Sequence, residues 1–204
     1  IDLRPGPVVD TEFYRDIRPI LERSCVSCHT AQARRPPGDL VLDDHAVYGG
    51  RGEELPGDYK RLADDRHAEW GRPPVIRGRK WRPPNASRYV RMFQSRRSLL
   101  AWKVFGERLD GWSNDDHPTE AVPGDAGTLP AGADPNDADL DFDGEICPPP
   151  GTAPPLTEAE KRAIARWIDL GAPIDSGRER GTEAWGLYLD DRRPTLALSQ
   201  PRPG

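Results

Sequence analysis

The sequence predicts a mostly α-helical domain with long loop insertions. Apolar residues recur at helical spacing in several short segments. The 23 prolines, 20 glycines and 31% charged residues among 204 predict extensive irregular structure between those segments. Six tryptophans, five tyrosines and four phenylalanines still supply enough large apolar groups for one core. We therefore expect a single domain over residues 1–175 and a polar C-terminal tail over 176–204.

Three helices can be placed in the first half of the chain. Apolar residues recur every four positions over 13–21, and Pro19 should kink this helix or restart it, so a short helix is expected from about residue 19. Residues 85–93 begin with possible capping residues and carry apolar side chains, which predicts a second helix. The third is expected between Ser98 and Gly106.

The other segments are expected to be loops, with one further helix. Residues 31–84 are rich in Pro, Gly, Arg and Asp, which predicts loops and short helices, and only residues 40–42 suit a β-strand. No apolar periodicity survives over about 110–155, which predicts an inserted loop. A Thr-x-x-Glu capping box at Thr157 then begins a helix that should close at Gly171.

Charge is distributed unevenly along the chain. The formal net charge is −5, but the segment 109–160 holds 13 acidic residues and no Lys or Arg, which leaves the remainder basic. The overall negative charge argues against a nucleic-acid-binding protein, and either charged region could steer a charged partner. No stretch approaches the roughly 20 apolar residues of a membrane-spanning helix, so no transmembrane segment is expected.

Residues 25–29, Cys-Val-Ser-Cys-His, form the most informative motif. Covalent attachment of haem needs two thiols on one helical turn and a following imidazole for the iron, and Cys25, Cys28 and His29 supply these groups. Half of a zinc site is a rival interpretation, but one cysteine and three scattered histidines would have to complete it. A thioredoxin-type pair would need flanking strand-helix-strand patterns, which the polar segment before Cys25 does not show.

Haem attachment would also determine the compartment. Because thioethers to haem form outside the cytoplasm in bacteria, we expect a periplasmic or otherwise extracytoplasmic protein whose signal peptide has been removed from the mature chain. In an oxidising compartment a third cysteine, Cys147, is conspicuous.

The run FYRDIRPILERSCVSCH, residues 13–29, resembles the start of the planctomycete-type cytochrome c domains. The segments ICPPP (146–150) and LTEAEKRAIARWIDLGAPID (156–175) resemble that family's methionine-Pro-Pro loop and last helix. Together they cover roughly a quarter of the chain. The resemblance implies a cytochrome c-like helical domain around one covalently bound haem c, with His29 as the proximal ligand.

The identity of the distal ligand is open. Where the family places its distal methionine this chain has Cys147, and a thiolate there would stabilise the ferric iron and lower the reduction potential. Cys147 is the first choice, but it could instead be a small buried hydrophobic residue or a disulfide partner of another chain. The sixth position would then be vacant, filled by water, or filled by one of the following: Met92, His45, His67 or His117.

The acidic segment offers a second candidate metal site. Asp139, Asp141 and Asp143 place hard oxygen ligands on alternate residues, a pattern that suits calcium. A calcium ion there would rigidify the loop that carries Cys147. An EF-hand is excluded because its closing glutamate would fall at Pro150, and a solvated acidic turn is the alternative interpretation.

Three classes of function remain. An electron carrier that exchanges single electrons with a redox protein or multihaem complex is favoured. A haem-containing docking subunit of a larger assembly is the alternative, and the long loops would make its contacts. A haem enzyme or ligand sensor ranks last because no catalytic constellation stands out, so we assign no catalytic residues and expect a carrier, not an enzyme.

Overall fold

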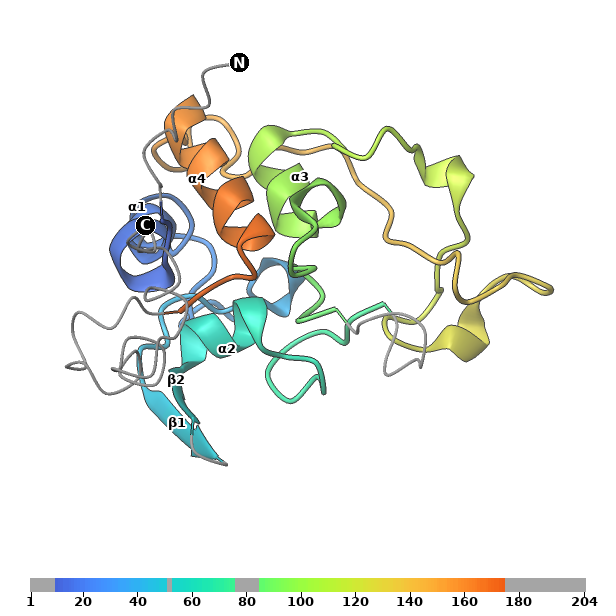
Figure 1. The fold of residues 1–204 in the computed structure, drawn as a ribbon, viewed down its shortest axis with the longest axis horizontal. Coiled ribbons are helices and arrows are strands. Elements are labelled where there is room, and N and C mark those ends of the chain that lie inside the picture. The colour runs from blue at the N-terminus through green and yellow to red at the C-terminus, as the bar shows by residue number, and fades with distance from the viewer. Residues whose placement is uncertain (1–9, 51–52, 76–84, 175–204) are drawn as a thin grey trace, which may run out of the picture. The chain divides into compact units, whose positions relative to one another are not determined.

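The structure is helical with one small sheet (Figure 1). A computed structural model describes residues 10–50, 53–75 and 85–174. In these ranges the α-helices are α1 (Arg18–Ser24), α2 (Gly57–Ala63), α3 (Leu99–Phe105) and α4 (Glu158–Asp169), and strand β1 (Val47–Gly50) pairs antiparallel with β2 (Glu53–Pro56). Short 3-10 turns lie at Pro37–Asp39, Ser95–Arg97, Asn114–Asp116 and Ala126–Thr128. These elements confirm the mostly helical class that the sequence predicts. The predicted tail, 176–204, lies outside the described residues.

The N-terminal helix divides at its proline, as expected. A π-helical turn over Phe13–Ile17 precedes α1, and Pro19 occupies the first turn of α1, where a missing N–H costs no hydrogen bond. The ring of Phe13 is fully buried, with its centroid 5.1 Å from that of Tyr59 and 5.9 Å from that of Trp167. This aromatic contact joins the N-terminal helical segment to α2 and α4.

The two C-terminal α-helices begin and end where their local signals indicate. Helix α3 follows Ser98 and ends at Gly106, whose φ of +81° is the left-handed conformation that glycine adopts without strain. At the start of α4, the Thr157 and Glu160 side chains each accept the other residue's backbone N–H, which completes the predicted capping box. On α4 the buried face includes Trp167, whose indole N–H donates to the carbonyl of Pro173 at 2.9 Å.

Two sequence-based predictions of secondary structure are wrong. Residues 85–93 form a turn, because the Ser87 hydroxyl accepts the N–H groups of Tyr89 and Val90 at 3.0 and 3.1 Å and donates to the carbonyl of Leu62. Residues 40–42 form no strand, since their backbone groups bond to His29 and not to a neighbouring strand.

Residues 110–155 contain turns but no α-helix or β-strand. They leave the helical body after α3 and return before α4 (Figure 1). Their apolar side chains share a small core with the body, formed by Val75, Trp102, Ala138 and Leu140. This shared core gives the long insertion a defined position on the body.

Among the described residues, none of the helices has both the length and the apolar character needed to cross a bilayer.

An ion pair links α1 to the capping box of α4. The Arg23 guanidinium donates to both carboxylate oxygens of Glu160, at 2.5 and 2.9 Å. These bonds lower the pKa of Glu160 to about 2, and the capping bonds from Thr157 act in the same direction. Glu160 therefore remains charged in the folded chain at pH values where the unfolded chain binds a proton.

Replacing Glu160 should lower stability in a pH-dependent way. Because the folded pKa lies below its usual value of 4.5, the contribution is complete above about pH 4.5 and is lost as the pH falls toward about 2. We expect Glu160→Gln to lower the free energy of unfolding at pH 7 by about 1 kcal/mol, and the difference to disappear across that window in urea titrations. Glu107→Gln, at an exposed carboxyl just after α3, is the control. A difference that stays constant with pH would contradict this prediction.

Candidate functional site

The Cys-x-x-Cys-His motif continues the helical path of α1. The N–H of Cys25 donates to the carbonyl of Leu21 at 2.7 Å, and those of Cys28 and His29 donate to the carbonyl of Cys25 at 3.1 and 3.0 Å. These bonds place two thiols and one imidazole on a single turn. That is the arrangement the motif needs to engage one haem.

The His29 ring is held by a backbone carbonyl. Its Nδ1 lies 3.1 Å from the carbonyl oxygen of Leu40, and the N–H of Leu42 donates to the carbonyl of His29 at 2.8 Å. Because a carbonyl oxygen only accepts, Nδ1 carries the proton and Nε2 keeps its lone pair. Burial lowers the pKa of His29, so the neutral form that binds metals is favoured.

Cys147 lies near the far end of the insertion and is anchored to α3. Its N–H donates to the carbonyl of Lys103 in α3 at 2.7 Å. Burial raises the pKa of Cys25 to about 12, and the Cys147 and Cys28 thiols add to this effect, in that order. Burial also raises the pKa of Cys147, and Cys28 again contributes. All three cysteines are free thiols and are partly buried.

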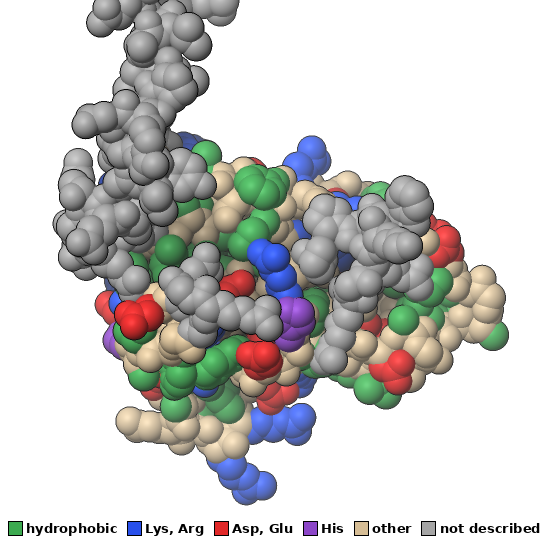
Figure 2. Space-filling model, turned by 60° about the horizontal axis from the view of Figure 1, so that its bottom comes forward, with side chains coloured by type: hydrophobic (Ala, Val, Ile, Leu, Met, Phe, Trp, Pro, Cys, Tyr) green, Lys and Arg blue, Asp and Glu red, His purple; other side chains and the backbone are tan. Residues whose placement is uncertain are grey.

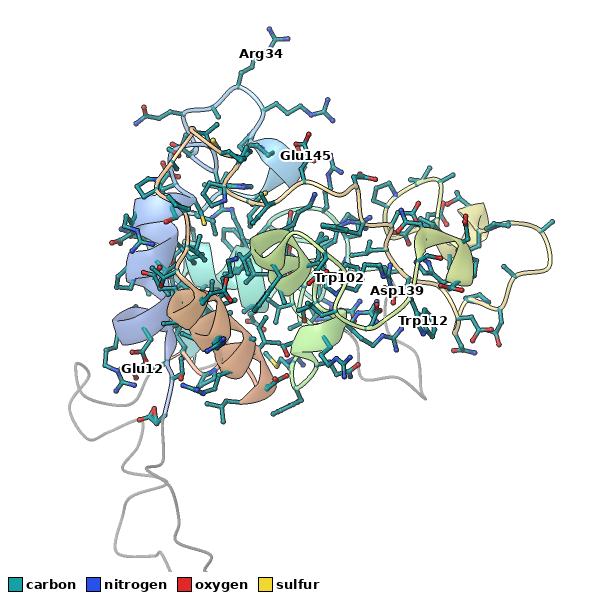
Figure 3. All side chains as sticks on the ribbon, turned by 90° about the horizontal axis from the view of Figure 1, so that it is seen from above. Glu12, Arg34, Trp102, Trp112, Asp139 and Glu145 are labelled. Atoms are coloured by element: carbon teal, nitrogen blue, oxygen red, sulfur yellow. The ribbon has the colours of Figure 1, made fainter. Side chains whose placement is uncertain are left out.

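The approach of Cys147 depends on the end of α3. A Cβ added to Gly106 would lie 3.2 Å from the Cβ of Ile146, so the residue before Cys147 packs directly against this glycine. In Figure 3, Glu145 lies near the N-terminal segment that carries Arg34, whereas Asp139 and Trp112 lie farther out on the insertion. The return path of the insertion therefore leads to the motif.

The histidines predicted as alternative ligands lie in different environments. His117 is buried, with Nε2 2.9 Å from an Arg108 nitrogen and Nδ1 3.4 Å from the Thr119 hydroxyl, so both ring nitrogens are engaged. His67 is exposed. The Nε2 of His45 lies 3.6 Å from a carboxylate oxygen of Glu22 on α1.

Met92, the other alternative, lies beside the end of α4. The next residue, Phe93, donates its N–H to the carbonyl of Ile168 at 2.8 Å. Met92 is half-buried there.

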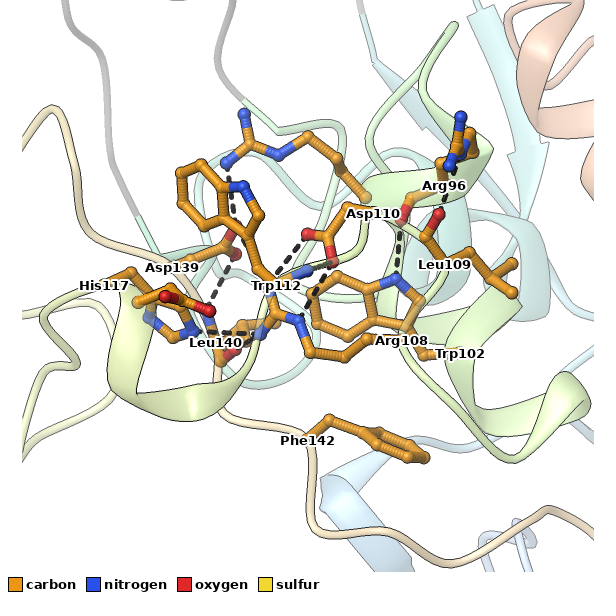
Figure 4. A network of polar contacts seen from close by, with 12 residues as sticks. Arg96, Trp102, Arg108, Leu109, Asp110, Trp112, His117, Asp139, Leu140 and Phe142 are labelled. Carbon is orange, nitrogen blue, oxygen red and sulfur yellow. Dashed lines mark hydrogen bonds and ion pairs between the residues drawn. The ribbon is translucent and has the colours of Figure 1, made fainter.

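Asp139 is the centre of a buried ion-pair network (Figure 4). Its carboxylate contacts Arg91, lies 2.8 Å from a nitrogen of Arg97, and lies 3.7 Å from one of Arg108. Asp139 itself is fully buried. A buried carboxylate needs such partners, because desolvation penalises its charge.

Arg108 extends this network toward the body. It donates to both carboxylate oxygens of Asp110, at 3.1 and 2.8 Å, and to the carbonyl of Leu140 at 2.7 Å. Its guanidinium carbon lies 4.1 Å from the ring centroid of Trp102. Asp110 at the start of the insertion, Leu140 farther along it and Trp102 of α3 thus share one guanidinium.

The three aspartates predicted to bind calcium do not converge. Asp139 faces arginines, Asp141 accepts a hydrogen bond from the Thr119 hydroxyl at 2.6 Å, and Asp143 is exposed. Within residues 10–50, 53–75 and 85–174, no group of three or more His, Cys, Asp or Glu side chains has the arrangement of a metal site. Arginine cations, not a calcium ion, neutralise the carboxylate expected to lead that site.

The acidic insertion and the basic remainder of the chain partly neutralise each other through ion pairs in the folded structure. Body arginines neutralise inward-facing carboxylates of the insertion, and Arg88 does so for Glu120 at 2.8 Å. On the face shown in Figure 2, acidic, basic and apolar side chains are interspersed. The uneven distribution of charge along the sequence was the one feature that could have indicated ion pairs between these arginines and the insertion. It did not identify which carboxylates they bind. No sequence signal marked the Leu40 carbonyl as the partner of His29.

Comparisons with known proteins find little similarity. No protein-family model matches the chain, and no curated protein matches it significantly. Among solved structures, the chain is similar to one described as Kuenenia stuttgartiensis hydrazine synthase, with 23% identity and a TM-score of 0.46 over 81% of this chain. The chain spans 16% of the length of that protein chain. At this sequence identity and TM-score, the similarity is not evidence for the fold or the function of this chain.

Removing the Asp139 carboxylate should strongly destabilise the chain. In Asp139→Asn three arginines lose their shared anion inside the protein, and we expect a loss of about 3–5 kcal/mol in the free energy of unfolding by urea titration. Asp143→Asn, on the exposed part of the same segment, should change it by less than about 0.5 kcal/mol. Equal effects of the two substitutions would show that the network does not stabilise the insertion.

Proposed function

We propose that this chain is an extracytoplasmic c-type cytochrome domain that carries single electrons through one covalently attached haem c. The observation that carries the proposal is the state of His29. Its Nδ1 is bound by the Leu40 carbonyl, which leaves Nε2 free on the same helical turn as Cys25 and Cys28.

The residues present fit a haem c. Two free thiols and a neutral imidazole are the groups that covalent attachment and proximal ligation require. Bound haem supplies a one-electron ferric/ferrous couple. The chain would hold and orient the group: Cys25 and Cys28 would anchor it, and His29, whose ring is held by the carbonyl of the buried Leu40, would bind its iron.

We infer that Cys147 provides the distal ligand. Of the five candidates, it is the one that stands where the cytochrome family places its distal methionine, and it is partly buried. His117 is engaged at both ring nitrogens and His67 is exposed, which weakens their claims. A thiolate ligand would give a low-potential carrier, because the anionic sulfur stabilises ferric iron.

A haem-bearing docking subunit is the second candidate. Many carboxylates of the insertion face outward, including Asp115, Asp137 and Glu145, and Trp112 is 42% exposed among them. Such a surface suits contact with a redox protein or multihaem complex that presents basic groups. Electron transfer and docking are compatible roles.

Haem attachment is tested directly by exporting the chain in a bacterium that matures c-type cytochromes. We expect one haem per chain that survives denaturing gel electrophoresis and gives a two-thioether pyridine haemochrome spectrum. Cys25→Ser with Cys28→Ser should abolish the covalent haem, while Cys147→Ser should retain it. Absence of covalent haem from the unaltered chain would refute the proposed function.

The distal ligand is tested by low-temperature EPR of the oxidised protein. A low-spin thiolate signature should be present in the unaltered chain and in Met92→Leu, and should disappear in Cys147→Ser. The same variant should show a higher reduction potential, because the anionic donor has been removed. An unchanged spectrum in Cys147→Ser would assign the sixth position to another group.

A further inference from the structure

The Leu40 carbonyl that orients His29 follows directly on a turn with an unusual backbone. In the turn Pro37–Asp39, Gly38 has a φ of +63° and Asp39 a φ of +58°, so two successive residues are left-handed. Glycine adopts this conformation freely, whereas a residue with a Cβ does so at a cost. Such a backbone persists where surrounding contacts hold it. The position of the Leu40 carbonyl therefore depends on the groups that bind this turn.

Tyr89 binds this turn from a buried position. Its hydroxyl donates to the carbonyl of Gly38 at 2.6 Å, and Tyr89 is only 8% exposed. Burial raises the pKa of Tyr89 to about 12, so the phenol keeps its proton and remains a donor. Asp39 also forms ion pairs with Arg72 and Arg35, at 2.7 and 3.8 Å, but these side chains lie at the surface, where an ion pair contributes little. The hydroxyl of Tyr89 is thus the stronger restraint on the turn.

Tyr89 is itself held by two helices. Its carbonyl accepts the N–H of Leu100 in the first turn of α3 at 3.0 Å. Its N–H donates to the Ser87 hydroxyl at 3.0 Å, and that hydroxyl donates in turn to the carbonyl of Leu62 in α2. The phenol therefore starts from a fixed backbone, and its hydroxyl can hold the turn in one position.

We propose that Tyr89 is a positioning residue for His29, which acts by holding the turn that carries the Leu40 carbonyl. The N–H of Leu40 donates to the carbonyl of Pro37 at 3.2 Å across this turn, so Leu40 moves with it. The Leu40 carbonyl in turn lies 3.1 Å from Nδ1 of His29 and fixes the tautomer in which Nε2 is free. This role applies to the chain with or without haem. Only its consequence for haem rests on the proposed function.

In a haem-bearing chain the same contacts would tune the reduction potential. A firmly held Nδ1–H makes the other nitrogen of a histidine a stronger donor to a metal, and a stronger donor favours ferric iron. Loss of the Tyr89 hydroxyl should weaken the bond from His29 to Leu40 and raise the potential. Tyr89 would thus act on the proximal side of the site, opposite the ligand assigned to Cys147.

Tyr89→Phe tests the proposal, because it removes the hydroxyl and keeps the ring. Tyr59→Phe is the matched control: Tyr59 is also buried, and its hydroxyl donates to the carbonyl of Ala172 after α4 at 2.7 Å. Each substitution removes one buried hydrogen bond to a backbone carbonyl, so a general loss of stability should be similar in both variants. Only Tyr89→Phe should change the state of His29.

The tautomer of His29 is measured by nitrogen-15 NMR of the full-length, haem-free chain at a pH where the ring is neutral. The unaltered chain and Tyr59→Phe should show mainly the Nδ1–H tautomer. Tyr89→Phe should raise the ratio of Nε2–H to Nδ1–H at least about threefold, because one hydrogen bond of ordinary strength is weakened. An unchanged ratio in Tyr89→Phe, an equal rise in Tyr59→Phe, or a mixture of tautomers in the unaltered chain would overturn the proposal.

The haem-bearing chain tests the consequence for the potential. At equilibrium with a redox mediator of fixed potential, the ferrous-to-ferric ratio should be at least about threefold higher in Tyr89→Phe than in the unaltered chain or in Tyr59→Phe. Exchange of the His29 Nδ1 proton with solvent should also be faster in Tyr89→Phe. Failure to attach haem counts against the proposed function alone, because the tautomer measurement needs no haem. Equal ratios and equal exchange rates in the three chains would overturn the effect of Tyr89 on the haem.

Discussion

The buried carboxylate of Asp139 is the contact on which the layout of this chain depends. Its charge is tolerable inside the protein because guanidinium groups from residues 91, 97 and 108 surround it. These arginines flank α3, while Asp139 lies in the second half of an insertion that has no α-helix or β-strand. The network therefore closes the insertion onto the body and directs the chain toward Cys147.

Helices and loops contribute differently to the candidate site. Helix α1 and the turn that follows it present the two motif thiols and His29 through local backbone bonds. The third thiol arrives on an irregular segment, whose position depends on the end of α3 and on the ion-pair network. The motif and Cys147 are therefore positioned by different elements of the fold.

The errors of sequence-based prediction have a common cause. Residues 40–42 have the composition of a strand, but the carbonyl of Leu40 binds the His29 ring and the N–H of Leu42 binds its backbone. Ser87 was expected to cap a helix, but its hydroxyl bridges a turn to the carbonyl of Leu62. In each case, a tertiary partner used the backbone or side-chain group on which the local prediction relied.

The sequence by itself determined the features whose partners lie within one helical turn. These are the position of Pro19, the Thr157 capping box, the glycine end of α3 and the turn that bears Cys25, Cys28 and His29. Only the tertiary structure decided which arginines bind Asp139, which carbonyl orients His29 and which residue of α3 anchors the backbone of Cys147. Those pairings join residues far apart in the chain, so they depend on packing and burial, which no local spacing encodes.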